Sequence, residues 1–318
     1  MSTLPPIFAE RLAAIVPPDR LDAVLASFAL EKPLCARHNP LRGPLEAAHA
    51  ALLATGATLA PLAECPGAWI VTPPVGPSGP DRRAVTDSPA VTRGLVHLQN
   101  PSSLLPPLAL GVGPDDQVLD LCAAPGGKTL HLAGMLSERG HLAAVEAVKP
   151  RFFKLKGVLE RGGAIAPGRS VRLFLKDGRT VGGAVPERFD KILVDAPCSS
   201  EARFDALDPT SFAHWSPKKI AECAHKQRGL LASGLAALRP GGALVYCTCS
   251  FAPEENEDVV LETLAGLGDR VVTTPLDPWL PQRPPDWTPG LRGLDHALRV
   301  LPGPLWDGFF LVRLEKRP

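Results

Sequence analysis

The stretch VLDLCAAPGGKTLHLA, residues 118–133, places an apolar strand, a turn of small residues and the start of a helix in direct succession. In an open parallel sheet, ligands bind beyond the carboxyl ends of the strands, and small residues let the backbone approach a ligand closely. We therefore expect this turn to hold a cofactor. The turn and the first residues after it are Cys122, Ala123, Ala124, Pro125, Gly126, Gly127 and Lys128.

The residues of this turn and of the next strand narrow the choice of cofactor. The dinucleotide pattern G-x-G-x-x-G is absent, and Cys122 stands where a phosphate-binding loop needs its first glycine. Glu146 ends the next apolar run, where an acidic side chain can bind two ribose hydroxyls. A nucleoside cofactor without a pyrophosphate, S-adenosylmethionine, fits this pattern. A tight turn followed by a surface glutamate is the alternative.

Short apolar runs alternate with longer helical patterns on both sides of this stretch. The alternation predicts an α/β fold with a parallel sheet covered on both faces. The predicted strands are 117–121, 141–146, 170–175, 189–195 and 242–248, with two late strands at 271–274 and 309–314. The predicted helices are 128–137, 150–161, 217–238 and 253–264.

The rest of the chain divides by composition. Residues 1–75 have helical apolar spacing, including a helix from Leu45 to Leu53, and are expected to form a small N-terminal domain of RNA-binding type. Residues 76–93 are rich in proline and glycine and predict a linker, which leaves 94–318 as the catalytic domain. Residues 275–304 hold too many prolines for regular structure and predict a long functional loop.

Composition excludes several classes of protein. The 318 residues include 36 Pro and 29 Gly, but 45% are hydrophobic, which excludes a disordered or fibrous chain. No apolar run is long enough to cross a membrane, and the N-terminus lacks the pattern of a signal peptide. We expect a cytoplasmic monomer that does not bind membranes. Seven cysteines without a secretion signal argue against a disulfide framework.

Three side chains are expected to converge near the reactive end of the cofactor: Asp195, Cys198 and Cys249, which follow two predicted strands. No second ligand pair accompanies Cys247-x-Cys249, so no metal site is predicted, and the redox pattern C-x-x-C is absent. A thiolate nucleophile remains, and Lys128 could supply the positive charge that a thiolate needs. The alternative for any single cysteine is a small apolar strand residue, which we expect for Cys35, Cys65, Cys223 and Cys247.

Taken together, these segments resemble the S-adenosylmethionine-dependent RNA cytosine-5 methyltransferases, the Sun-domain enzymes of the RsmB and RsmF type. The resemblance covers most of the chain. It is carried by three blocks in order: DLCAAPGGKT (120–129), VDAPCS (194–199) and TCSFAPEENE (248–257). Further blocks are LPPIFAERL (4–12), RHNPLR (37–42), GLVHLQNPSSLLPPLAL (94–110), RPGG (239–242) and WDGFFLVRL (306–314). The resemblance implies a class I methyltransferase fold, with a mostly parallel seven-stranded sheet.

The resemblance also implies roles for single residues. Cys249 adds to carbon 6 of a cytosine, Cys198 assists release of the methylated product, and Asp195 holds the base. The cofactor contacts extend beyond the turn to Glu146, Arg151, Asp177 and Asp195, and Lys128 is shared by both sites. The RNA target is ribosomal or transfer RNA, with ribosomal RNA favoured.

Two features qualify this reading. The family usually has Ser-Gly-x-Gly after the Pro-Cys motif, whereas Ser200, Glu201 and Ala202 follow Ser199 here. The stretch 149–179 is strongly basic and predicts a phosphate-contacting flank, for which a solvated helix face is the alternative. Two other functions remain possible: a DNA cytosine methyltransferase with Cys198 as nucleophile, and a catalytically silent RNA-binding or assembly factor.

Overall fold

A computed structural model describes residues 4–318, and its centre is a nine-stranded mixed sheet. The strands are β7 (Gln117–Asp120), β8 (His141–Glu146), β9 (Ser170–Leu175), β10 (Phe189–Asp195), β11 (Leu238–Thr248), β12 (Val271–Thr274), β13 (Trp287–Pro289), β14 (Leu298–Val300) and β15 (Phe309–Lys316). Seven of them run in the order β9-β8-β7-β10-β11-β15-β12. All neighbouring pairs from β9 to β11 are parallel, and β15 is antiparallel to both of its neighbours.

The seven predicted strands are therefore present, but the sheet is larger than predicted. The extra strands β13 and β14 form a hairpin that pairs with the first half of β15, through Leu298 opposite Leu311. They lie inside the proline-rich stretch 275–304, for which no regular structure was expected. That expectation was wrong because prolines at the ends of short strands do not interrupt the pairing between them.

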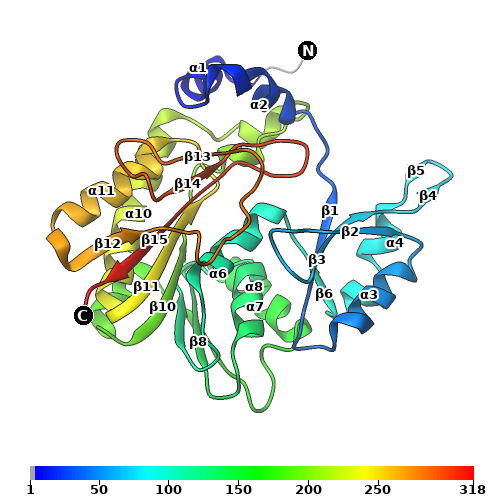
Figure 1. Ribbon diagram of the computed structural model, residues 1–318, viewed down its shortest axis with the longest axis horizontal. Helices are drawn as coiled ribbons and strands as arrows, with labels where there is room; N and C mark the ends of the chain where they lie inside the picture. The colour runs from blue at the N-terminus through cyan, green and yellow to red at the C-terminus, as the bar shows by residue number, and fades with distance from the viewer. Residues whose placement is uncertain (1–3) are drawn as a thin grey trace.

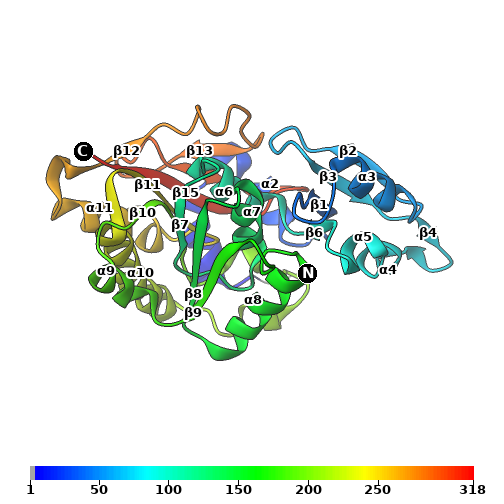
Figure 2. The same ribbon diagram turned by 90° about the horizontal axis from the view of Figure 1, so that it is seen from below.

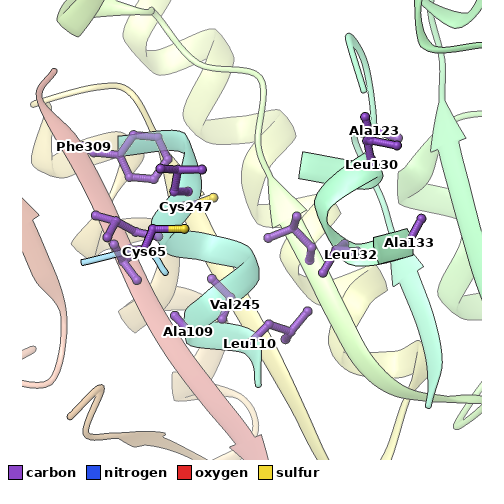
Figure 3. Close-up of a cluster of buried hydrophobic side chains, with 14 of the residues drawn as sticks. Cys65, Ala109, Leu110, Ala123, Leu130, Leu132, Ala133, Val245, Cys247 and Phe309 are labelled. Atoms are coloured by element: carbon purple, nitrogen blue, oxygen red, sulfur yellow. The ribbon is translucent and has the colours of Figure 1, made fainter. Parts of the chain in front are cut away.

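Helices cover both faces of the sheet, as predicted. They are α6 (Leu105–Leu110), α7 (Gly127–Met135), α8 (Lys149–Arg161), α9 (Val181–Ala184), α10 (Pro217–Ala237) and α11 (Glu257–Ala265). One face packs against α6, α7 and α8, and the other against α10 and α11. Figure 3 shows the first of these interfaces, where Ala109 and Leu110 of α6 lie against Val245 and Cys247 of β11.

A small α/β unit lies beside the large sheet (Figures 1 and 2). Its antiparallel sheet has the order β2-β3-β1-β6. The strands are β1 (Leu34–His38), β2 (Thr58–Pro61), β3 (Ala68–Thr72) and β6 (Val96–Leu98), and the helices are α3 (Leu45–Leu53), α4 (Arg82–Thr86) and α5 (Pro89–Thr92). The two-residue strands β4 (Val75–Gly76) and β5 (Gly79–Pro80) form a hairpin that projects from the unit.

The prediction of a linker at 76–93 is therefore wrong. This stretch contains the hairpin strand β5 and the helices α4 and α5, and Val85 and Ala90 are buried in the core of the small unit. The Asp81 side chain caps α4 by accepting from the Arg83 and Ala84 amides. The unit ends only with β6, which pairs with β1 through His97 opposite Arg37. A boundary at 94 would remove this strand from the sheet.

The first two helices, α1 (Pro6–Ala13) and α2 (Leu21–Ser27), belong to neither sheet. They lie over the part of the chain that forms the large sheet, at the top of Figure 1. Phe8 packs against Phe28, Phe204 and Phe251, with ring centroids 4.8–6.3 Å apart. Residues 1–75 are thus not one compact domain, and residues 1–3 of that range lie outside the described residues. Burying a phenylalanine in this way contributes roughly 1.5–3 kcal/mol, which fixes the helices beside the loops that follow β10 and β11.

Candidate active site

The turn after β7 is held in a fixed shape by its own hydrogen bonds. Thr129 in the first turn of α7 donates to Asp120 Oδ2 at 2.7 Å and to the Ala123 carbonyl at 3.0 Å. Gly126 precedes α7 with φ +116°, a conformation that side chains disfavour. A Cβ on Gly127 would lie 2.8 Å from His97 Nε2, so glycine lets β6 of the small unit pack against the start of α7. The small unit therefore lies directly against the predicted cofactor turn.

A cavity of about 910 Å³ opens at this edge of the large sheet. A cavity of this size can enclose a nucleoside-sized ligand and part of a second one. Eleven of the predicted site residues line it: Cys122, Ala123, Ala124, Pro125, Gly126, Gly127, Lys128, Arg151, Asp195, Cys198 and Cys249. Its other walls come from the end of α2 and the residues after it (27–32), from the stretches 97–103 and 200–205, and from Lys154, Pro302, Asp307 and Phe309.

Two predicted cofactor residues, Glu146 and Asp177, are not among the residues that line this cavity. Glu146 is buried at the end of β8, where one carboxylate oxygen accepts from the Val148 amide at 2.8 Å and the other lies 3.6 Å from Arg151. Arg151 also donates to the Ala124 carbonyl at 2.8 Å and so joins Glu146 to the turn. Asp177 follows β9 and is bonded to Arg179, which lowers the pKa of Asp177.

Lys128 and Asp195 form a largely buried ion pair. Lys128 Nζ lies 2.7 Å from Asp195 Oδ2, and the ring of Phe309 lies 5.4 Å below the ammonium group. Burial alone would lower the pKa of Lys128, but the charge of Asp195 raises it above the ordinary value, so the ammonium stays charged. The second Asp195 oxygen accepts from the Cys247 thiol at 3.4 Å. The charge of Lys128 is thus already paired with a carboxylate.

The two predicted reactive thiols are in contact. The Sγ atoms of Cys198 and Cys249 are 3.3 Å apart, although they follow different strands. A hydrogen bond from Cys198 lowers the pKa of Cys249 below that of an ordinary thiol, and the charge of Arg203 adds to the effect against the burial that opposes it. The same contact and burial raise the pKa of Cys198 well above the ordinary range. Of the two, Cys249 is the one that this environment favours as a thiolate.

Four cysteines, Cys35, Cys65, Cys223 and Cys247, were expected to be small apolar residues, and all four are buried. Burial raises the pKa of Cys35 to about 12, and those of Cys65 and Cys223 to about 11. Cys247 is fully buried, and its pKa is also raised by burial. The seven cysteines are free thiols in the structure.

Two buried glutamates that sequence reasoning did not single out connect the loops that carry the thiols. Glu201 accepts from the backbone amides of Phe251 and Ala252 at 2.7 and 3.0 Å, and also from Ser250 and Trp215. Glu255 accepts from the Ser199 amide at 2.9 Å and from Ser250 and Gln227. The acidic run at 254–257 was the only sequence signal for Glu255. These bonds fix Cys249 relative to Cys198.

The loop that departs from the family pattern keeps a glycine-like backbone. Ser200 has φ +61° and ψ +32°, in the left-handed region that glycine adopts most readily. The following residues form a single 3₁₀ turn, η4 (Glu201–Arg203). The Ala202 amide donates to the Cys249 carbonyl at 3.0 Å. The substituted loop therefore contacts the backbone of Cys249 itself.

Residues 4–318 contain no group of three or more His, Cys, Asp or Glu side chains that could hold a metal ion. In the same range, no helix has the length and apolar character needed to cross a membrane.

Comparison with protein families gives a match over the large sheet. The family described as 16S rRNA methyltransferase RsmB/F matches residues 107–315, from α6 to β15. Its three most specific sequence blocks, around Lys128, Cys198 and Cys249, all lie in this range.

Similar proteins extend the match toward the N-terminus. The chain is 35% identical over 324 residues to the ribosomal RNA small subunit methyltransferase F of Serratia proteamaculans, covering 98% of this chain and 63% of that protein. It is 39% identical over 227 residues to the protein of the same name from Salmonella agona, and this match covers 70% of this chain and 45% of that protein. The chain thus spans about half to two thirds of the length of these relatives.

A solved structure shows the same fold. A methyltransferase homologue from Pyrococcus horikoshii superimposes with a TM-score of 0.80 and 28% sequence identity. The match covers 98% of this chain and 95% of that one, so it includes the small α/β unit as well as the large sheet. The class I methyltransferase fold predicted from the sequence is confirmed.

Proposed function

The chain belongs to the 16S rRNA methyltransferase RsmB/F family, and from this membership we propose that it transfers a methyl group from S-adenosylmethionine to carbon 5 of a cytosine in RNA. The proposed RNA is that of the small ribosomal subunit. The observation that carries the proposal is the contact between Cys198 and Cys249 at the wall of a cavity that also holds the Lys128–Asp195 pair.

The residues present fit S-adenosylmethionine. The first residues of α7, Gly127 and Lys128, line the cavity together with Ala124, Pro125 and Gly126, and the backbone amides at the start of a helix bind a carboxylate well. Glu146 and Asp177 lie outside the lining of the cavity, at the end of β8 and after β9, and as carboxylates we propose them as acceptors for ribose hydroxyls or the amino group of the base. When bound, the cofactor supplies an electrophilic methyl group.

Cys249 acts first on the cytosine. Carbon 5 of cytosine is a poor nucleophile, and addition of the Cys249 thiolate to carbon 6 makes carbon 5 enamine-like. Asp195, oriented by Lys128 and Cys247, can accept a hydrogen bond from the amino group of the base, and also from the ring nitrogen once that nitrogen is protonated. After methylation, a water molecule takes the proton from carbon 5, the electrons of that bond restore the carbon 5–carbon 6 double bond, and the electron pair of the breaking carbon 6–sulfur bond returns to Cys249. Cys198, 3.3 Å away and a protonated thiol in the free enzyme, is placed to assist this release.

The alternative with Cys198 as nucleophile, which would suit a DNA methyltransferase, has less support. Burial and the contact with Cys249 keep Cys198 a thiol, whereas Cys249 is the favoured thiolate. A silent assembly factor would need neither this pair nor the buried bonds that fix it. We also propose that the protein acts as a cytoplasmic monomer, which size-exclusion chromatography with light scattering and cell fractionation would test.

The test is direct methylation of defined nucleic acids. The full chain is incubated with isotope-labelled S-adenosylmethionine and unmodified small-subunit rRNA, with transfer RNA and a DNA oligonucleotide of matched sequence in parallel. Mass spectrometry of the nucleosides should find labelled 5-methylcytidine in the rRNA, and bisulfite sequencing should locate it at a single cytosine. Label found only in transfer RNA would overturn the proposed RNA target. Label found only in DNA would overturn the proposed substrate class. The absence of label in all three nucleic acids would overturn the proposed activity.

A further inference from the structure

The thiolate form of Cys249 needs a nearby cation, and the structure limits which residue can supply it. Five cationic side chains line the cavity: Lys32, Lys128, Arg151, Lys154 and Arg203. Lys128, the candidate from the sequence, is paired with Asp195. Lys32 donates to the backbone carbonyls of Gly303 and Trp306, and Arg151 is held by Ala124 and Glu146.

Arg203 is placed by the loop that departs from the family pattern. The left-handed conformation of Ser200 starts η4, and the Arg203 amide donates to the Ser200 carbonyl at 2.9 Å. The preceding amide, that of Ala202, donates to the carbonyl of Cys249 at 3.0 Å. Arg203 is thus one residue from a direct backbone bond to Cys249. Its side chain is exposed to the cavity, and none of the ion pairs within residues 4–318 includes it.

We propose that Arg203 is the cation that stabilises the Cys249 thiolate, so that the substituted loop 200–203 activates the nucleophile. This inference rests on the proposed function, in which Cys249 attacks the cytosine. Arg203 acts through Cys249 and is therefore a positioning residue for its negative charge. The same charge helps twice: it keeps the sulfur ionised before attack, and it stabilises the sulfur anion that forms again when the carbon 6–sulfur bond breaks.

The electrostatics of the site support this assignment. Cys249 is the main cause of a raised pKa at Arg203, and Arg203 in turn lowers the pKa of Cys249. The other charged or titratable groups around the thiols are Asp195 and Cys198 after β10, Lys128 on α7, Glu255 after β11 and Asp307 before β15. Asp195 opposes ionisation of Cys249, and its pairing with Lys128 limits that effect.

The test measures the thiol directly and needs neither RNA nor methyl transfer. The rate of iodoacetamide labelling of Cys249 is followed between pH 5.5 and about 9.5 by peptide mass spectrometry, which separates Cys249 from Cys198. The wild-type midpoint should lie below the roughly 8.5 of a free thiol. Arg203→Gln and Arg203→Met should raise it by roughly one pH unit or more, since the loss of an opposite charge near a thiolate shifts a pKa by about that amount. Arg203→Lys should keep most of the wild-type shift because the charge remains.

A matched control is Lys154→Gln, which removes the same charge from the same cavity. It should leave the midpoint of Cys249 labelling in place. An unchanged midpoint in both neutral Arg203 variants would overturn the proposal, as would an equal shift in Lys154→Gln. Circular dichroism of each variant at every pH identifies unfolded samples, and Arg203→Lys provides a variant that keeps the charge and shape. A shifted midpoint in a protein without methylating activity would count against the proposed function alone.

Discussion

The sulfur atoms of Cys198 and Cys249 lie 3.3 Å apart, at the ends of the neighbouring strands β10 and β11. Because parallel strands end at the same edge of a sheet, residues 51 positions apart in the chain meet in one site. Their contact divides the two thiols chemically: it favours the charged form of Cys249 and the neutral form of Cys198.

This division predicts different outcomes for the two single variants. Cys249→Ala should lower methyl transfer by at least about 10³-fold because the nucleophile is lost. Cys198→Ala should slow release and leave protein bound covalently to RNA, seen as a shifted band on a denaturing gel. The double variant Cys198→Ala, Cys249→Ala is the control and should show no shifted band. A band that persists in the double variant would mean that neither thiol forms the adduct.

The Lys128–Asp195 pair predicts strong thermodynamic coupling. Removing one partner leaves the other charge in a site where the Lys128 and Asp195 side chains are only 13% and 26% exposed. Lys128→Met and Asp195→Asn should each lower the free energy of unfolding. The loss in the double variant should be smaller than the sum of the two single losses by about 1–3 kcal/mol. Urea unfolding of the four proteins measures this. The exposed pair Arg139–Asp115 is the matched control and should show little coupling.

Much of this architecture follows from local sequence patterns. The bounds predicted for β8, β9 and β10, and for α3 in the small unit, are those of the structure. Each is a short apolar run or a helical repeat bounded by turn residues, so the information lies within the element itself. The convergence of Asp195, Cys198 and Cys249 followed from one topological rule, since Asp195 ends a strand of a parallel sheet and the two cysteines follow such strands.

The predictions that were wrong or incomplete concern residues whose packing or pairing partners lie far away in the sequence. Val85 and Ala90 are buried only because α4 and α5 pack on the small sheet, and the proline and glycine around them gave no sign of it. The apolar faces of α1 and α2 predicted burial but not the partner, which is the aromatic cluster around Phe204. Lys128 was assigned to the thiolate because its pairing with Asp195, 67 residues away, is not visible in the sequence. The glycine that the family usually has at position 200 hinted at the left-handed turn of Ser200, but nothing in the sequence indicated that Arg203 would line the same cavity as Cys249.

Asp120 predicts a pH dependence of stability. Burial raises the pKa of its carboxyl to about 7, with Asp195 adding to the effect and the Thr129 hydroxyl and Lys128 opposing it. The folded state therefore binds a proton that the unfolded chain releases near pH 4, so the contribution of Asp120 to stability is complete below pH 4 and falls as the pH rises through about 7.

The variant Asp120→Asn should remove this dependence because the amide does not ionise. Between pH 5 and pH 8, the difference in unfolding free energy between wild type and variant should change by on the order of 2 kcal/mol, in favour of the variant at pH 8. Urea unfolding at both pH values measures the change. Asp269→Asn, exposed in the turn 268–270, is the control, and a difference that stays constant in Asp120→Asn would show that Asp120 is ionised throughout.

The backbone of Ser200 predicts an unusual order of stabilities. At φ +61°, a residue with a Cβ is strained by about 1 kcal/mol or more, whereas glycine is not. Ser200→Gly and Ser200→Ala both remove the hydroxyl, so their difference isolates the conformational term, and Ser200→Gly should be the more stable by about 1 kcal/mol. The matched control is Glu222 in the exposed middle of α10, where the order should reverse because glycine disfavours a helix by about 0.5–1 kcal/mol relative to alanine. Thermal unfolding of the four variants decides the matter. If alanine were the more stable residue at both positions, the left-handed turn would not be the conformation of residue 200 in solution, and the position of Arg203 beside Cys249 would lose its structural basis.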